Sequence, residues 1–201
     1  MLTEKNPSYF YDTKDFAQLL FLEDHWKLVQ KEVTDLLKTK DSGQWLTTFP
    51  DYVNSNTPSA WEVYTFQFFN MDNIPNRVQC KQTSDLIKQI PELISCDYSI
   101  IKPKTQIKAH TGYSKLILRC HLPLIVPSGD LCQIRVGDET RTWKEGELLI
   151  FDNSHEHEAW NNSDEIRVVL MFDIPNPLWQ YSAHEISKYK IGETKFFKKP
   201  K

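Results

Sequence analysis

The chain has 201 residues, of which 40% are hydrophobic and 25% charged, and its formal net charge is −3. This length and composition are typical of one soluble globular domain, and the charge gives no reason to expect nucleic acid or an anionic membrane as a partner. No apolar run approaches the roughly 20 residues that span a bilayer, and the N-terminus lacks a secretory signal pattern. We therefore expect a cytoplasmic protein.

Residues 1–92 are predicted to form a helical and irregular support. Residues 1–15 read as an irregular lead-in, and from Asp15 apolar residues recur at spacings of three and four. That periodicity predicts one amphipathic helix, or two with a break near Glu23, ending within residues 38–42. Residues 61–69 are aromatic and β-branched enough for a strand. Residues 83–90 predict a short helix that Pro91 ends.

Residues 93–180 are predicted to form the β core of a single domain that covers residues 1–201. Strand patterns recur at residues 95–101, 115–126, 131–136, 141–143, 148–151 and 166–172. Turn residues separate them every eight to twelve positions, which indicates an antiparallel barrel or sandwich. Residues 181–201, with the Lys-rich end 195–201, are expected to be a loosely held tail, and residues 160–163 a loop.

The four cysteines show no CxxC spacing, so neither a zinc knuckle nor a thioredoxin-type site is indicated. They are Cys80, Cys96, Cys120 and Cys132. We expect reduced thiols, as is usual in cytosolic proteins, with a pair of disulfides as the alternative.

Two histidines are candidate metal ligands. His110 follows a strand pattern, and His157 lies 47 residues further on. A strand pair could bring both to a barrel mouth. Two neutral imidazoles would leave several coordination positions open, as oxygen-activating Fe(II) sites require. The alternative is that both are exposed loop histidines. The sequence has no GxSxG, Walker, HExxH or Gly-rich dinucleotide motif.

Three further polar residues interrupt apolar strands. Arg119 and His121 share one strand face, because alternate residues point the same way; that face is either a carboxylate pocket or a solvent-exposed side. Arg167 lies within a run that is otherwise apolar on both faces. Its planar fork would suit a bound dicarboxylate, and a structural salt bridge is the alternative. Trp143 and Phe151 are expected to fill the core, with Gly146 in a turn.

An ordered set of motifs resembles the aspartyl/asparaginyl β-hydroxylase family. The set comprises His110-Thr-Gly112, Leu118-Arg119-Cys-His121-Leu122, Thr142-Trp143-x-x-Gly146, Ile150-Phe151-Asp152-x-Ser154-x-Glu156-His157-Glu158-x-Trp160 and Arg167. The resemblance covers about residues 60–180 and, more weakly, residues 25–28. It implies an Fe(II)- and 2-oxoglutarate-dependent dioxygenase, mostly β with flanking N-terminal helices, built on a double-stranded β-helix (a cupin-like jelly roll).

The resemblance also implies roles for individual residues. His110 and His157 match the two iron ligands. Gly112 stands where most related dioxygenases place an Asp or Glu ligand; this family has glycine there too, which implies water at the vacant position. Arg167 and Ser99 match the residues that hold the distal carboxylate of 2-oxoglutarate.

His121 matches a histidine near the other carboxylate of 2-oxoglutarate, and Arg119 a basic residue that meets the acidic group of the substrate. The implied reaction uses O2, forms succinate and CO2, and hydroxylates an unactivated C–H bond, expected at the β-carbon of an Asp/Asn-like amino acid or residue. A halogenase and a non-catalytic cupin that binds a small carboxylate are the alternatives.

One departure concerns the substrate. Animal members carry a second arginine where this chain has Ile117, so an aspartyl carboxylate would lose one of two clamps. We also expect the protein to lack the membrane anchor and the helical-repeat region of those members. We therefore expect a free amino acid, a carrier-bound amino acid or a cytosolic protein side chain as substrate.

Overall fold

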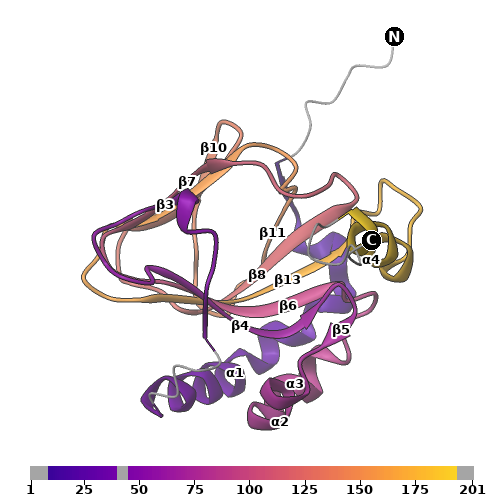
Figure 1. Cartoon of the computed structure of the whole chain (residues 1–201), viewed down its shortest axis with the longest axis horizontal. Helices are drawn as coiled ribbons and strands as arrows, with labels where there is room; N and C mark the ends of the chain where they lie inside the picture. Colours follow the sequence, from indigo (N-terminus) through magenta and orange to yellow (C-terminus); the bar gives the residue numbers. More distant parts are fainter. Residues whose placement is uncertain (1–8, 40–44, 194–201) are drawn as a thin grey trace, which may run out of the picture.

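Two antiparallel β-sheets, backed by helices on one side, make up the protein (Figure 1). The structure, a computed structural model, describes residues 9–39 and 45–193. The larger sheet runs in the order β1 (Phe10–Tyr11), β11 (Leu149–Phe151), β8 (Ile117–Ile125), β13 (Arg167–Pro175), β6 (Ser95–Ile101), β4 (Trp61–Phe68) and β2 (Leu46–Thr47), with β5 (Met71–Asp72) paired to β4. The smaller sheet runs β10 (Glu139–Thr142), β9 (Cys132–Val136), β12 (His157–Asn161), β7 (Thr105–His110) and β3 (Val53–Asn54).

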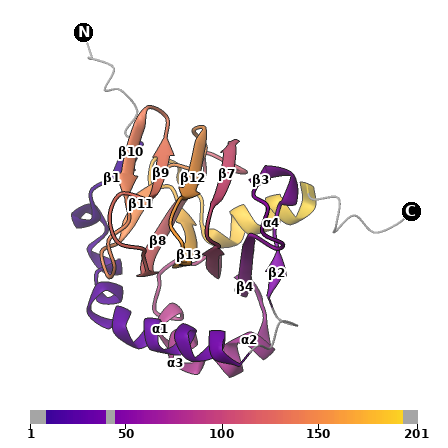
Figure 2. The same cartoon turned by 90° about the vertical axis from the view of Figure 1, so that its left-hand side faces the viewer.

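The strands from β6 to β13 form a double-stranded β-helix. In chain order they alternate between the sheets, except for the hairpin of β9 and β10. This gives β11-β8-β13-β6 in one layer facing β10-β9-β12-β7 in the other, which is a jelly roll. Figure 2 shows the strands of the smaller sheet lying side by side, with β3 at one edge. The predicted fold class is confirmed.

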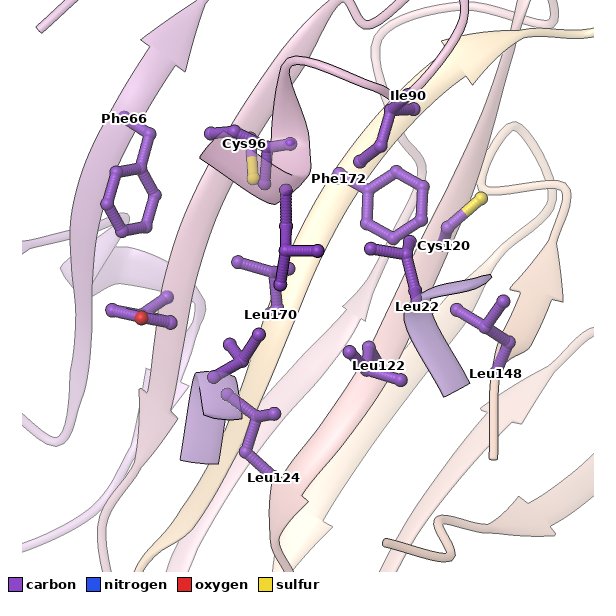
Figure 3. Close-up of a cluster of buried hydrophobic side chains, with 14 of the residues drawn as sticks. Leu22, Phe66, Ile90, Cys96, Cys120, Leu122, Leu124, Leu148, Leu170 and Phe172 are labelled. Atoms are coloured by element: carbon purple, nitrogen blue, oxygen red, sulfur yellow. The ribbon is translucent and has the colours of Figure 1, made fainter. Parts of the chain in front are cut away.

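Helices cover the outer face of the larger sheet. They are α1 (Phe21–Lys38), α2 (Ile74–Gln79) and α3 (Lys81–Ile87), with a 3-10 helix at Thr13–Leu19 before α1. Cys120 and Leu122 of β8 point toward the helices and join the core there, together with Leu22 and Leu170 (Figure 3). Leu118 belongs to the same core cluster. Burying these side chains provides the main stabilisation of the layer, at roughly 25 cal/mol per Å² of apolar surface.

The opposite face of β8 carries Arg119 and His121, which therefore lie between the two sheets. β13 repeats the pattern: Val168, Leu170 and Phe172 pack toward the helices, and Arg167 lies on the inner side. The helices cover one face of β8 and β13 and the smaller sheet faces the other, which explains why these two strands read as almost continuously apolar.

Several predicted boundaries were wrong. The N-terminal helical segment is interrupted at Phe16, which takes non-helical backbone angles, and α1 runs from Phe21 through Glu23 without the predicted break. The expected loop at residues 160–163 begins inside β12, where Trp160 and Asn161 pair with β9. Residues 10–11 of the expected lead-in pair with β11 as strand β1.

The region after residue 180 contains a helix, α4 (Ala183–Glu193), where a loose tail was expected. Ala183 and Ile186 pack it against Ile94 and Ile117. The expected Lys-rich tail at residues 195–201 lies outside the described residues. All four cysteines are buried and free, as predicted.

Candidate functional site

A pair of histidines faces across two neighbouring strands. β12 pairs with β7 in a register that places His157 opposite His110, and their ring centroids are 4.3 Å apart. Each Nδ1 contacts a backbone carbonyl two residues earlier: Lys108 O at 2.8 Å from His110 and His155 O at 2.9 Å from His157. Because a carbonyl oxygen only accepts, each Nδ1 carries the proton, and each Nε2 keeps a free lone pair.

Burial keeps both rings neutral. It lowers the pKa of His157 to about 3 and also lowers the pKa of His110. A neutral imidazole with its tautomer fixed by a hydrogen bond to Nδ1 is the form that binds a transition metal through Nε2. The pair can therefore supply two nitrogen ligands.

Gly112 cannot be replaced by a carboxylate ligand without moving its surroundings. A Cβ at this position would lie 2.6 Å from Asn153 Cγ and 2.8 Å from Asn153 O, and the Gly112 amide already donates to that same carbonyl at 2.6 Å. Within residues 9–39 and 45–193, no group of three or more His, Cys, Asp or Glu side chains could hold a metal ion. The two imidazoles of His110 and His157 are therefore the metal ligands that the described residues offer here.

Arg167 is buried without a carboxylate partner. Its side chain is only 2% exposed, its Nη1 donates to Ser99 O at 3.2 Å, and its guanidinium lies 4.5 Å from the centre of the Trp143 ring. The Nε atom has no hydrogen-bond partner. Burial lowers the Arg167 pKa to about 10. The alternative of a structural salt bridge is not found, since no ion pair among the described residues includes Arg167.

His121 presents a second unused donor. Trp143 Nε1 donates to His121 Nδ1 at 3.1 Å, so this neutral ring carries its proton on Nε2. Burial holds the pKa of His121 well below its usual value. His121 Nε2 is buried without a partner. A buried N–H that is left unpaired costs about 1–3 kcal/mol, so a fitting acceptor would stabilise the site.

All six predicted site residues meet in one cavity between the sheets. It is lined by Ser99, His110, Arg119, His121, His157 and Arg167, together with Trp61, Phe151 and Met171. Trp61 Nε1 donates to Ser99 Oγ at 3.1 Å, which leaves the Ser99 hydroxyl proton available. The cavity is narrow, about 30 Å³, and shares Trp61, His110 and Arg119 with a mouth of about 160 Å³.

Sequence reasoning missed part of this lining. Trp143 was treated as scaffold, yet it contacts both Arg167 and His121. Trp61 was seen only as a strand residue. Nothing local in the sequence separates these tryptophans from core residues, because their role depends on which strands lie beside them.

Arg119 has its own carboxylate. Its Nε and Nη2 donate to the two oxygens of Asp173 at 2.9 and 3.0 Å, and the side chains are 14% and 6% exposed. The register of β13 and β8 places the two residues opposite each other. A bidentate pair of this kind uses two of the donor groups that were expected to meet an acidic substrate.

His155 and Ile117 are placed outside the cavity. The His155 ring packs edge-on against Tyr9, with 5.0 Å between ring centres, so its contribution to the site is the backbone carbonyl that orients His157. Ile117 is buried in the cluster under α4.

The double-stranded β-helix with these side chains gathered between its sheets places the molecule among the cupin-type proteins. The family model for aspartyl/asparaginyl beta-hydroxylase matches residues 23–177. The chain belongs to this family, as the motifs indicated.

Curated relatives agree with the family. An ornithine lipid ester-linked acyl 2-hydroxylase of Rhizobium tropici is 34% identical over 84% of this chain, and the human aspartyl/asparaginyl beta-hydroxylase is 34% identical over 78% of it. The chain spans 60% of the first relative and 21% of the second.

Among solved structures, an oxidoreductase of the 2OG-Fe(II) oxygenase family from Burkholderia pseudomallei shares 12% identity at a TM-score of 0.44; the match covers 64% of this chain and 72% of that one. Among the helices of the described ranges, none is long and apolar enough to cross a bilayer.

Proposed function

We propose that the protein is an Fe(II)- and 2-oxoglutarate-dependent dioxygenase that hydroxylates an unactivated C–H bond and releases succinate and CO2. One observation carries the proposal. Two buried donors, Arg167 Nε and His121 Nε2, have no acceptor in the cavity that also holds the neutral pair His110 and His157. A dicarboxylate supplies acceptors at its two ends, and the histidines supply metal ligands.

The residues present fit both groups. His110 and His157 would hold iron through Nε2, because both Nδ1 atoms are bonded to backbone carbonyls. Arg167 and the Ser99 hydroxyl would hold one carboxylate of 2-oxoglutarate, and His121 would donate to the other. When bound, iron supplies the activation of O2 and the oxidation of the C–H bond.

The protein contributes orientation and the exclusion of water. Trp143 fixes the His121 tautomer through its indole N–H and stacks on Arg167, so both carboxylate-binding side chains are held before the cosubstrate arrives. Phe151 and Met171 line the cavity with apolar surface, which strengthens each charged contact by limiting solvent. Such preorganisation reduces the entropic cost of binding.

The substrate belongs to the proposal as well. Two of the relatives are named for hydroxylation of aspartyl or asparaginyl residues and of an ester-linked acyl chain. We propose that the substrate is a small molecule, an amino acid or a peptide, and that it is not a nucleic acid. The Arg119–Asp173 pair disfavours recognition of a substrate carboxylate by Arg119 alone.

The test is succinate formation. Purified protein with Fe(II), ascorbate and 2-oxoglutarate should form succinate under air, and a panel of amino acids, peptides and acylated amino acids should accelerate it. The double variant His110→Ala/His157→Ala is the control and should form none. Cosubstrate binding without succinate across the panel would favour a non-catalytic cupin. A chlorinated product in the presence of chloride would favour a halogenase, in which chloride takes the place that Gly112 leaves open.

A further inference from the structure

A long groove continues outward from the cavity over the exposed half of the larger sheet. It measures about 820 Å³ and shares Phe49, Trp61, Tyr113 and Arg119 with the mouth of the cavity. Its floor is formed by inner-face residues of β4, β6, β8 and β13, and its walls by β2, β5 and the start of α2. The volume is of the size that holds small organic molecules.

The walls of this groove are apolar and exposed. Thirteen large hydrophobic side chains are exposed in the described parts of the chain, and six of them line the groove. These six are Leu46, Phe49, Phe68, Met71, Ile74 and Tyr113. Exposed apolar side chains scattered singly need no explanation, whereas a concentration along one groove indicates a binding surface.

The floor holds two carboxyl groups, Asp97 and Asp173, and one guanidinium group, that of Arg119. Arg119 and Asp173 neutralise each other, and at the rim Asp72 is paired with Arg77 at 2.8 Å. Asp97 makes no ion pair with any described residue; its carboxyl accepts a hydrogen bond from Thr65. Burial, as the largest cause, raises the pKa of Asp97 to about 7. A partly buried carboxyl of this kind is stabilised by an incoming cation.

We propose that the groove binds an amphiphilic substrate, with a flexible aliphatic chain along the apolar walls and an amino group that pairs with Asp97. The inference rests on the proposed function for the position of the reacting centre, and it narrows that function to one substrate class. Charge complementarity selects an ammonium group rather than a carboxylate, because Arg119 is already occupied. Continuity through Trp61 and Tyr113 places part of the ligand beside His110.

Binding of simple probes to the whole chain tests this without turnover. Isothermal titration calorimetry would compare octylamine, octanol, octanoate and butylamine in the absence of iron and 2-oxoglutarate. Octylamine should bind at least about tenfold more tightly than octanoate, the size of a charge-assisted contact. Butylamine should bind more weakly than octylamine, by about twofold to fourfold per missing methylene.

Matched variants locate each part of the ligand. Asp97→Asn should lower the affinity for octylamine to that for octanol, and Asp97→Glu should retain the preference for the amine. Asp72→Asn removes the same charge from a carboxylate that already has a cation, so the preference should persist. Met71→Ser, at an exposed wall position, should weaken octylamine and octanol equally.

Equal or tighter binding of octanoate, indifference to chain length, or an unchanged preference in Asp97→Asn would overturn the inference. Its failure is distinguishable from failure of the proposed function. Absence of succinate with an intact amine preference would reject the dioxygenase alone, whereas succinate formation without that preference would reject only the substrate class.

Discussion

Replacement of Arg167 by methionine separates the energetics of the fold from those of the cosubstrate. In the folded chain the guanidinium is buried with Nε unpaired, and a pKa near 10 in place of 12.5 corresponds to roughly 3 kcal/mol of destabilisation of the charged form. Because this pKa is lowered and arginine is a cation, the cost is present at every pH below about 10. Folding therefore bears this cost at neutral pH.

Arg167→Met removes that cost and also removes favourable contacts. The bond to Ser99 O contributes about 1 kcal/mol, and the stacking on Trp143 a further 1 kcal/mol or so. The ligand-free variant should therefore be more stable by about 1 kcal/mol, which raises Tm by about 2–4 °C in a chain of this size. Because the variant lacks one partner of a buried charge pair, its binding of 2-oxoglutarate should be weaker by about 2–5 kcal/mol, or about 30-fold to several thousandfold in Kd.

The assay combines thermal unfolding with and without 2-oxoglutarate and an anaerobic titration of the cosubstrate in the presence of Fe(II). 2-Oxoglutarate should raise the Tm of the wild type. The ligand-free Arg167→Met variant should have a higher Tm than the ligand-free wild type, and 2-oxoglutarate should raise that Tm by almost nothing, while iron still binds. Arg141→Met, which removes an arginine already paired with Glu139, should keep the cosubstrate effect. A variant that is less stable without ligand yet binds 2-oxoglutarate normally would refute both halves of the reasoning.

Three further outcomes are expected. His157→Ala should abolish Fe(II) binding in an equilibrium titration, while His184→Ala on α4, which is exposed, should bind iron normally; iron binding by His157→Ala would reject the ligand assignment. Gly112→Asp should fail to improve iron affinity and should destabilise the fold by about 1–3 kcal/mol in urea unfolding, because its Cβ would collide with Asn153; unchanged stability would contradict that geometry. The folded-state pKa of Asp97 is raised to about 7, so the folded chain binds this proton more tightly than the unfolded chain. Wild-type stability relative to Asp97→Asn should then fall by about 2–4 kcal/mol as pH rises from about 4 to 7, and a flat difference across that range would show that Asp97 is solvated.

The β core could be predicted because its pattern is local. The alternation of Leu118, Cys120 and Leu122 with Arg119 and His121 follows from the two-residue period of a strand, and turn residues mark the strand ends. The motif set around His110 and His157 then indicated the family, which the family model confirms. The short strand β12 and the helix α4 were missed, because neither has a distinctive period and both are stabilised by packing.

The partners of the site residues could not be predicted. Asp173 pairs with Arg119 across 54 positions of sequence because β13 and β8 meet in one register. The contact of Trp143 with Arg167 likewise joins residues from separate strands. A shift of one residue in either register would turn these side chains to the other face of the sheet, and no local pattern specifies that register.

The sequence by itself determined which residue types are available: two histidines flanking strands, an arginine in an apolar run and a glycine after the first histidine. Those features follow from composition and spacing along the chain. Only the tertiary structure decided that Arg167 and His121 each keep one unused donor and that Arg119 is already neutralised. It also decided that an apolar groove opens beside the histidines and contains Asp97, which forms no ion pair with any described residue. Each of these properties depends on whether the neighbours of a side chain satisfy its hydrogen-bonding groups and its charge. Those neighbours lie on strands that are distant in the sequence.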